Sequence, residues 1–326
     1  MGSKLKVVVS DHDYPDLSIE KNVLEPIGAE VIGAQCKSGG KALIKYVKDA
    51  DAVLQQYAEI GEEVIRELTR CKVIARYGTG VDILDVKACH QKGITVTNVP
   101  YYCVDEVANH ALSLALTLTR RLPMYVNSVR QGKWHWSNSG IPIHRFEKQT
   151  FGVMGFGKIG RNILKKAKAL KFKLIAYDPY VDSFFMEQEG VEKVDFETLL
   201  GEADILSIHI PLTSQTRHII GETELRKMKN SSILINTARG PLVDNQALYR
   251  ALANGWISGA ALDDIEDEPA KQERWEFEKN LLLKLENCLI TPHSAYYSEE
   301  SIFTARKTAS EEVSSVLLGK KPRYTV

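Results

Sequence analysis

A glycine-rich segment, Gly155-Phe-Gly-Lys-Ile-Gly160, lies between a predicted strand and a predicted helix. Gly155 permits a tight turn, Gly157 lets the backbone come close to a pyrophosphate, and Gly160 lets the helix pack on the strand. Lys158 and Ile159 open the helix, whose free amides and positive dipole attract an anion. The segment therefore predicts a dinucleotide site rather than an ordinary glycine turn.

Asp178 ends the next predicted strand, about 20 residues beyond the glycines. A carboxylate at this position accepts hydrogen bonds from the adenosine ribose diol and repels a 2′-phosphate. The following Pro179-Tyr180 supplies no arginine to hold such a phosphate. We therefore predict NAD, rather than NADP, as the cofactor.

Polar residues also follow three later strands, at the ends where open α/β folds bind their ligands. They are Arg239, Glu268 and His293. Taken singly, each has an ordinary explanation: a surface arginine, a solvated Glu-Pro turn, or a histidine that caps the next segment. Because all three follow strands downstream of the glycine-rich segment, we treat them as candidates for one shared site.

Strand-like and helix-like segments alternate along the chain, which predicts an α/β fold with two doubly wound parallel sheets. The strands of the first sheet are expected at 4–10, 29–32, 52–54, 73–75 and 94–97. Those of the second are expected at 151–154, 173–177, 204–208, 232–236, 257–262 and 288–291.

Two long helices are predicted outside this alternation. One begins near Asp105 and ends before Pro123, with no strand to serve locally, so it is expected to bridge domains or to pack against a second subunit. The other runs from roughly Glu299 to Leu318 and is amphipathic.

Composition excludes several classes of protein. The 326 residues suit two domains, and the 42 basic residues balance the 42 acidic ones, so no net charge favours nucleic acid or a membrane surface. No apolar signal segment opens the sequence, and the five scattered cysteines form no C-x-x-C pair. We predict a cytoplasmic protein with a small-molecule partner.

Further segments make the sequence resemble the D-isomer-specific 2-hydroxyacid dehydrogenase family over nearly the whole chain. They are Arg76-Tyr-Gly-Thr-Gly-Val-Asp82, Asn98-Val-Pro, Glu106-Val-Ala-Asn-His-Ala, His209-Ile-Pro-Leu-Thr213 with Thr216, and Thr291–Glu300. The last segment looks closest to the branch of the carboxy-terminal-binding-protein corepressors, beside phosphoglycerate dehydrogenase-like members. The resemblance implies a Rossmann NAD-binding domain (100–293) and a flavodoxin-like, discontinuous substrate domain (1–99 plus 294–326).

The resemblance also implies a reaction, namely hydride transfer between NAD(H) and C2 of a small 2-keto acid or D-2-hydroxy acid. His293 would protonate the carbonyl oxygen, Glu268 would orient the imidazole, and Arg239 would bind the substrate carboxylate and keto oxygen. No metal is required.

The resemblance extends to binding residues in both domains. Residues implied for the substrate are Arg76, Gly78, Thr79, Gly80 and Tyr296, with Tyr101 and Tyr102 as further candidates for its pocket. Residues implied for the nicotinamide are Thr237, Ala238 and Asp263. Residues implied for the adenosine half are Pro211, Thr213, Thr216 and His209, although a structural role is favoured for His209.

The sequence departs from the family at three places. Asp264 stands where an apolar residue is usual, and Ala270–Leu285 is long, with Trp275 and Phe277 as candidates for a dimer or cleft surface. The loop containing Gln55–Ala58 lacks the basic residue of phosphoglycerate-using members. We therefore expect an unphosphorylated substrate, and the candidate pocket residues Tyr101, Tyr102 and Tyr296 favour an apolar or aromatic side chain on it.

The sequence leaves three alternative functions open. They are an NAD(H)-sensing binding protein of the corepressor type, a phosphoglycerate dehydrogenase, and a dehydrogenase of formate or phosphite. The short stretch after the last predicted helix favours an enzyme over a corepressor, because it holds no modification-rich tail. A homodimer is expected through the helix from Asp105, since family members pair there.

Overall fold

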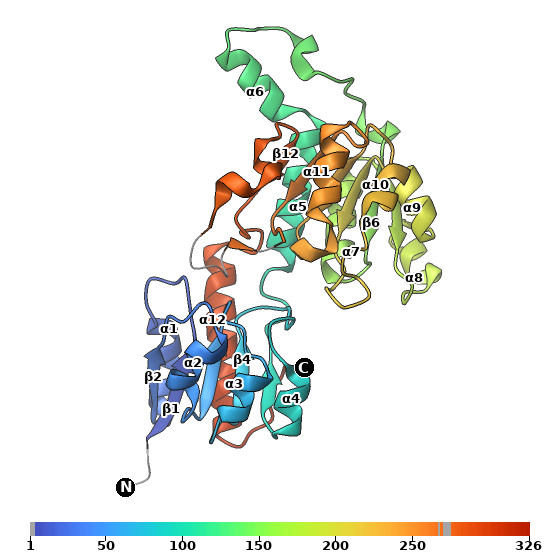
Figure 1. Cartoon of the computed structure of the whole chain (residues 1–326). Helices are drawn as coiled ribbons and strands as arrows, with labels where there is room; N and C mark the ends of the chain where they lie inside the picture. The colour runs from blue at the N-terminus through green and yellow to red at the C-terminus, as the bar shows by residue number, and fades with distance from the viewer. Residues whose placement is uncertain (1–3, 267, 270–274) are drawn as a thin grey trace. The chain divides into compact units, whose positions relative to one another are not determined.

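A computed structural model describes residues 4–266, 268–269 and 275–326. The chain divides into two compact units, each built of helices around one parallel sheet (Figure 1). Unit 1 consists mainly of residues 4–102 and 297–326, and unit 2 of Cys103–Glu268 and Glu276–Tyr296. The predicted fold class, two doubly wound α/β sheets, is confirmed.

The sheet of unit 1 has the strand order β2-β1-β3-β4-β5, as in flavodoxin-like folds. Its strands are β1 (Leu5–Val9), β2 (Ala29–Gly33), β3 (Ala52–Gln55), β4 (Val73–Arg76) and β5 (Thr95–Thr97). The connecting helices are α1 (Ser18–Leu24), α2 (Gly40–Val47), α3 (Glu62–Glu67) and α4 (Val86–Gln91). Every residue of β3 and β4 is buried, as expected of parallel strands covered on both faces.

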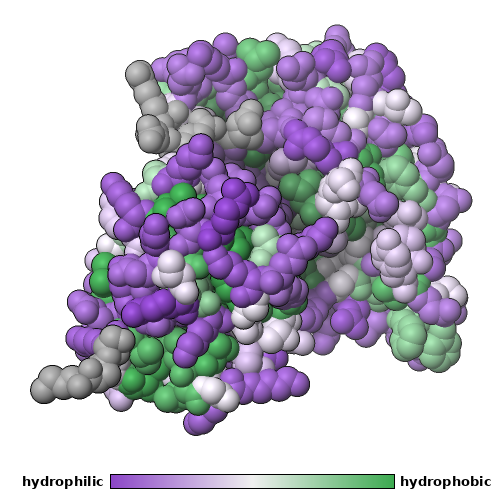
Figure 2. All heavy atoms as spheres, turned by 60° about the horizontal axis from the view of Figure 1, so that its bottom comes forward, coloured by the Kyte–Doolittle hydropathy of each residue, from purple (hydrophilic) through white to green (hydrophobic). Residues whose placement is uncertain are grey.

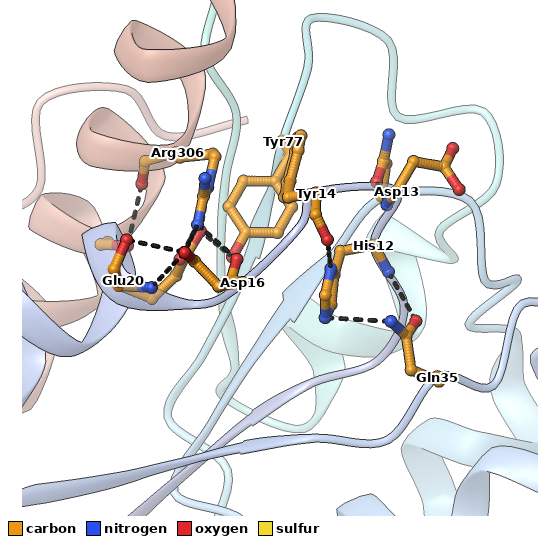
Figure 3. A network of polar contacts seen from close by, with 11 residues as sticks. His12, Asp13, Tyr14, Asp16, Glu20, Gln35, Tyr77 and Arg306 are labelled. Carbon is orange, nitrogen blue, oxygen red and sulfur yellow. Dashed lines mark hydrogen bonds and ion pairs between the residues drawn. The ribbon is translucent and has the colours of Figure 1, made fainter.

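The helix α12 (Glu299–Leu317) completes unit 1, although it is distant in sequence. Its Ala309 and Val313 are buried in the core of the unit 1 sheet. Its Arg306 donates hydrogen bonds of 2.9 and 2.7 Å to the two carboxylate oxygens of Glu20 on α1, and the Tyr77 hydroxyl donates to Glu20 at 3.0 Å (Figure 3). These buried contacts anchor α12 to α1.

The sheet of unit 2 has seven parallel strands in the order β8-β7-β6-β9-β10-β11-β12, which contains the Rossmann order 3-2-1-4-5-6. The strands are β6 (Thr150–Met154), β7 (Lys173–Tyr177), β8 (Glu192–Lys193), β9 (Ile205–Ile208), β10 (Ile233–Asn236), β11 (Gly259–Leu262) and β12 (Cys288–Ile290). The helices between them are α7 (Lys158–Ala169), α8 (Ser183–Gln188), α9 (Phe196–Glu202), α10 (Glu222–Lys227) and α11 (Asn245–Ala253).

The long helix α5 (Val104–Thr119) covers the sheet of unit 2. Its Ala108, Ala111 and Ala115 are buried in one core with Phe151 and Ile235. The strands that it covers lie further along the sequence, so the absence of a local strand does not leave the helix without a sheet to cover. Exposed apolar side chains lie instead on the next helix, α6 (Leu122–Arg130), and just beyond it, at Leu122, Val126, Val129, Trp134 and Trp136.

Figure 2 shows one face on which hydrophilic residues predominate and hydrophobic ones form small separate patches. Among the described residues, no helix combines the length and apolar character needed to cross a membrane.

Candidate active site

The glycine-rich turn begins where the strand order of unit 2 reverses, because β6 lies between β7 and β9. Gly155 has φ of +98°, and a Cβ on it would lie 2.7 Å from the carbonyl oxygen of His209. A Cβ on Gly160 would lie 2.0 Å from the Gly155 carbonyl oxygen, whereas a Cβ on Gly157 meets nothing within 4 Å. Packing thus requires the outer glycines, and the open space at the middle glycine fits a dinucleotide pyrophosphate.

Asp178 follows β7 and lies against the glycine-rich turn. Its two carboxylate oxygens accept hydrogen bonds of 2.9 Å from the amides of Phe156 and Tyr180. Each carboxylate oxygen has a further lone pair, so the group can still accept from a ribose diol. The amides of Lys158 and Ile159 begin α7 directly beyond the turn.

The segment after β9 contains the residues expected at the adenosine half. The Thr216 hydroxyl donates to the Pro211 carbonyl at 2.7 Å and accepts from the Thr213 amide at 2.8 Å, which makes a closed turn. His209 Nε2 lies 2.9 Å from the Ser207 hydroxyl. Burial lowers the pKa of His209 to about 3, so its imidazole is neutral at pH 7.

The loop after β10 is braced by Asn236, whose side chain is fully buried. Asn236 Oδ1 accepts from the Ala238 amide at 3.0 Å, and its Nδ2 donates to the Arg239 carbonyl at 2.8 Å. The Arg239 guanidinium donates to the Ala238 carbonyl at 2.8 Å. The buried Thr237 hydroxyl has no hydrogen-bond partner within the described part of the chain, which suits contact with a ligand.

Asp263, at the end of β11, holds the loop that carries His293. Its carboxylate accepts from the Thr291 hydroxyl at 2.5 Å and from the amides of Ser294 and Ala295 at 2.9 and 2.7 Å. Its main-chain carbonyl accepts from the His293 amide at 2.7 Å. The resemblance implies a place for Asp263 beside the nicotinamide, and the sequence gives no sign of this bracing.

The His293 and Glu268 side chains form a hydrogen bond through Nδ1 of the imidazole and Oε1 of the carboxylate. Glu268 is 7% exposed, and the Tyr296 ring lies edge-on to the imidazole with centroids 6.0 Å apart. Burial alone would lower the pKa of His293. The bond and charge of Glu268, together with the charge of Asp264, outweigh burial and the opposing Arg239, and raise that pKa above its ordinary value.

The loop after β4 in unit 1 contains the residues expected at the substrate carboxylate. The amides of Gly78, Thr79 and Gly80 donate to no acceptor among the described residues, which leaves three donors for an anion. Arg76 points its guanidinium at main-chain carbonyls, with Nε donating to Gly80 at 2.5 Å and Nη1 donating to Gln56. These contacts brace the loop.

Asp11 is a site-shaping residue that the sequence interpretation missed. It lies two residues beyond the end of β1 and is fully buried. Its carboxylate accepts from the amides of Gln56, Tyr57 and Ala58 at 3.3, 2.6 and 3.1 Å. An acidic residue just after the first strand was the available signal, and it holds the very loop that lacks a basic side chain.

The remaining predicted residues differ in how exposed they are. Tyr101 is 61% exposed and Tyr102 is partly buried. Trp275 and Phe277 are 43% and 54% exposed. Residues 270–274 of the long insertion lie outside the described residues.

The chain is similar in sequence to known dehydrogenases. Residues 112–295 match the family described as D-isomer specific 2-hydroxyacid dehydrogenase, NAD binding domain. The chain is 38% identical over 320 residues to D-3-phosphoglycerate dehydrogenase of Methanocaldococcus jannaschii, which covers 97% of this chain and 58% of that protein. It is 37% identical over 285 residues to glyoxylate reductase of Korarchaeum cryptofilum, which covers 86% of this chain and 84% of that protein.

A solved structure matches both units. D-Lactate dehydrogenase from Aquifex aeolicus, complexed with NAD and lactic acid, has a TM-score of 0.87 and 30% identity, with 96% of each chain covered. The chain thus spans a lactate dehydrogenase almost fully but little more than half the length of the phosphoglycerate dehydrogenase that it matches.

Proposed function

This chain belongs to the D-isomer-specific 2-hydroxyacid dehydrogenase family, and from that premise we propose that it interconverts a small 2-keto acid and the corresponding D-2-hydroxy acid. In this proposal residues 100–293 bind NAD and residues 1–99 plus 294–326 bind the substrate. When bound, the reduced cofactor supplies the hydride that reaches C2 of the keto acid.

The observation that carries the proposal is the hydrogen-bonded pair of His293 and Glu268 beside Arg239. His293 follows β12, Glu268 follows β11 and Arg239 follows β10. The glycine-rich turn follows β6. All these strands are parallel, so the four segments lie along one edge of the sheet. An acid–base group, a carboxylate anchor and a cofactor turn therefore share one edge.

His293 is proposed as the proton donor in reduction. Its Nδ1 is engaged by Glu268, so Nε2 is the nitrogen that passes a proton to the carbonyl oxygen. The negative Glu268 favours the imidazolium, which is the form that can donate. In the oxidation direction the neutral imidazole takes the proton back.

Arg239 is proposed to bind the substrate carboxylate and the keto oxygen. A planar guanidinium forms two parallel hydrogen bonds with such oxygens and stabilises charge that develops on the alkoxide. The unengaged amides of Gly78, Thr79 and Gly80 offer further donors for the carboxylate. Thr237 and Ala238 are proposed to border the nicotinamide, and Asp178 to favour NAD over NADP.

The substrate is proposed to be unphosphorylated. The loop Gln55–Ala58 is buried and contains no basic residue, and the amides of Gln56, Tyr57 and Ala58 already donate to Asp11, so they are not available to a phosphate. Tyr296 lies against His293, where it would contact an apolar or aromatic side chain. The resemblance to phosphoglycerate dehydrogenases makes 3-phosphohydroxypyruvate the main alternative substrate.

A homodimer is proposed as the assembly. The apolar side chains Leu122, Val126 and Val129 lie at helical spacing on α6 and are each about half exposed. Trp134 and Trp136 follow at 85% and 78% exposure. Burial of such a surface against a second copy would remove it from water.

The test is a turnover assay with NADH and a panel of glyoxylate, pyruvate, phenylpyruvate and 3-phosphohydroxypyruvate. We expect reduction of the unphosphorylated acids to be fastest. If 3-phosphohydroxypyruvate were reduced best, the substrate proposal would be wrong. If NADH bound but no acid in a broad panel were reduced, the NAD(H)-sensing binding protein would be the better interpretation.

A further inference from the structure

A third carboxyl group lies beside the acid–base pair of unit 2. Asp264 directly follows Asp263 and is 5% exposed. Asp264, Glu268 and His293 each place an oxygen or nitrogen atom within 4.8 Å of the others. Within the described residues, Oδ1 of Asp264 has no hydrogen-bond partner. A buried carboxyl oxygen without a partner is costly, so its position calls for a reason.

The segment that carries Asp264 is tightly held. A Cβ on Gly240 would lie 2.1 Å from the main-chain carbon of Ile265 and 2.6 Å from the Glu266 amide nitrogen. The Gly240 amide also donates toward the Asp264 carboxyl. The Asp264 carboxyl lies close to Glu268 and His293, and the charges of His293, Glu268 and Arg239 all act on it.

Two buried carboxyl groups so close together resist being ionised at the same time. Burial raises the pKa of Asp264, and the charge of Glu268 adds to the rise, whereas His293, Arg239 and the Gly240 amide oppose it. Nearby charges also affect the pKa of the His293 imidazole. The charge of Asp264 favours the protonated form of His293, whereas the charge of Arg239 disfavours it.

We propose that Asp264 is a positioning residue for proton transfer, which forms with Glu268 a buried carboxyl pair that keeps His293 protonated into more alkaline solution. This inference rests on the proposed function of the site. Reduction of each keto acid consumes one proton, which leaves His293 Nε2 for the substrate oxygen and is replaced from solvent. The negative charge of ionised Asp264 lies beside the imidazole and opposes loss of the imidazole proton as the pH rises.

The first test compares pH profiles of kcat/KM for keto-acid reduction at saturating NADH. Asp264→Asn keeps an oxygen that can accept from the Gly240 amide but loses the charge, and Asp264→Val supplies a second uncharged variant. We expect both variants to lose activity on the alkaline side about one pH unit earlier than the wild type, since a close charge shifts an imidazole by at least that much. The KM for NADH should stay unchanged.

Glu266→Gln is the matched control from the same loop. Glu266 pairs with Arg217 and His218 at 2.9 and 2.6 Å rather than with His293. Its removal should leave the alkaline limb where it is in the wild type. Thermal melts will show whether both Asp264 variants fold. If they fold and the alkaline limb of their kcat/KM profile lies at the same pH as in the wild type, the proposal is overturned. An equal shift in Glu266→Gln would also overturn it, because the effect would then be one of general charge.

A second readout does not depend on turnover. The imidazole of His293 can be titrated by NMR in histidine-labelled protein and assigned by its absence in His293→Gln. Its midpoint should be lower by about one pH unit in Asp264→Asn than in the wild type. If the protein reduces no keto acid but the His293 midpoint still shifts, the proposed function is refuted and the proposed role of the carboxyl pair is supported. An unshifted midpoint would refute the carboxyl pair whatever the activity.

Discussion

The main-chain amide of His293 donates a 2.7 Å hydrogen bond to the carbonyl of Asp263, and His293 has φ of +50°. A non-glycine residue in this left-handed region costs about 1–3 kcal/mol, and it persists only where its surroundings hold it. The carboxylate of Asp263 supplies that hold through the amides of Ser294 and Ala295. The direction of the imidazole is therefore set by the backbone as well as by Glu268.

Replacement of His293 should remove the chemical step and spare cofactor binding. We expect His293→Asn to lower kcat by roughly two to four orders of magnitude, the usual contribution of acid–base catalysis. Asparagine tolerates the left-handed backbone, so the loop should stay in place. Steady-state kinetics and fluorescence titration with NADH measure the two effects, and reduction at near wild-type rate would refute the mechanism.

Loss of the Glu268 charge should move the pH range of reduction. The Glu268 charge helps to raise the pKa of His293, so Glu268→Gln should lower that pKa and deprotonate the imidazole at lower pH. The alkaline limb of kcat/KM for reduction should accordingly shift to lower pH, and activity at acidic pH should be affected least. A limb that stayed in place or moved to higher pH would contradict the assigned role.

A lysine at position 239 should bind the substrate poorly. Arg239→Lys keeps the positive charge but loses the planar two-point grip, so KM for the keto acid should rise and kcat should fall together. Arg250→Lys is the matched control, because Arg250 lies on α11 and pairs with Glu222 at the surface. An unchanged KM in Arg239→Lys would argue against substrate contact.

Cofactor preference should depend on Asp178. The wild type should use NADH with a higher kcat/KM than NADPH, and Asp178→Ala should narrow the ratio because the group that repels a 2′-phosphate is gone. Part of the loss with NADH will reflect the lost bond to the Phe156 amide. Equal use of both cofactors by the wild type would count against the assignment.

The half-exposed face of α6 should mediate self-association. Val126→Glu places a charge in the middle of that face and should convert a dimer to a monomer, as measured by light scattering at micromolar concentration. Phe184→Glu is the control, since Phe184 is 58% exposed on α8. A monomeric wild type would refute the proposed assembly.

Much of the fold could be predicted because local patterns determine it. Strands such as β7 and β10 are short runs of buried apolar residues between breaks, and the structure places them within a residue of the predicted bounds. The helices α5 and α12 also begin and end close to their expected residues, because their apolar spacing is regular over many turns. The turn Gly155–Gly160 was predictable because its glycine spacing lies between a strand pattern and a helix pattern, and the structure shows that packing requires its outer glycines.

Other features depend on contacts between distant residues. Asp11 accepts hydrogen bonds from amides more than forty positions away, and the sequence around Asp11 does not identify those amides as its partners. β8 has only two residues, too few for a pattern to show. The apolar face of α5 was visible, but only the tertiary structure reveals that it covers the sheet of unit 2 and leaves α6 as the exposed apolar helix.

The anchoring of α12 has a consequence for how the chain folds as it is synthesised. The core of unit 1 includes Ala309 and Val313, and Glu20 has no guanidinium partner until Arg306 has been added. Unit 2 lies between these segments in the sequence. Domains fold as units during synthesis, so unit 2 can fold first. The sheet of unit 1 is synthesised earliest, but its core is complete only after α12 has been added.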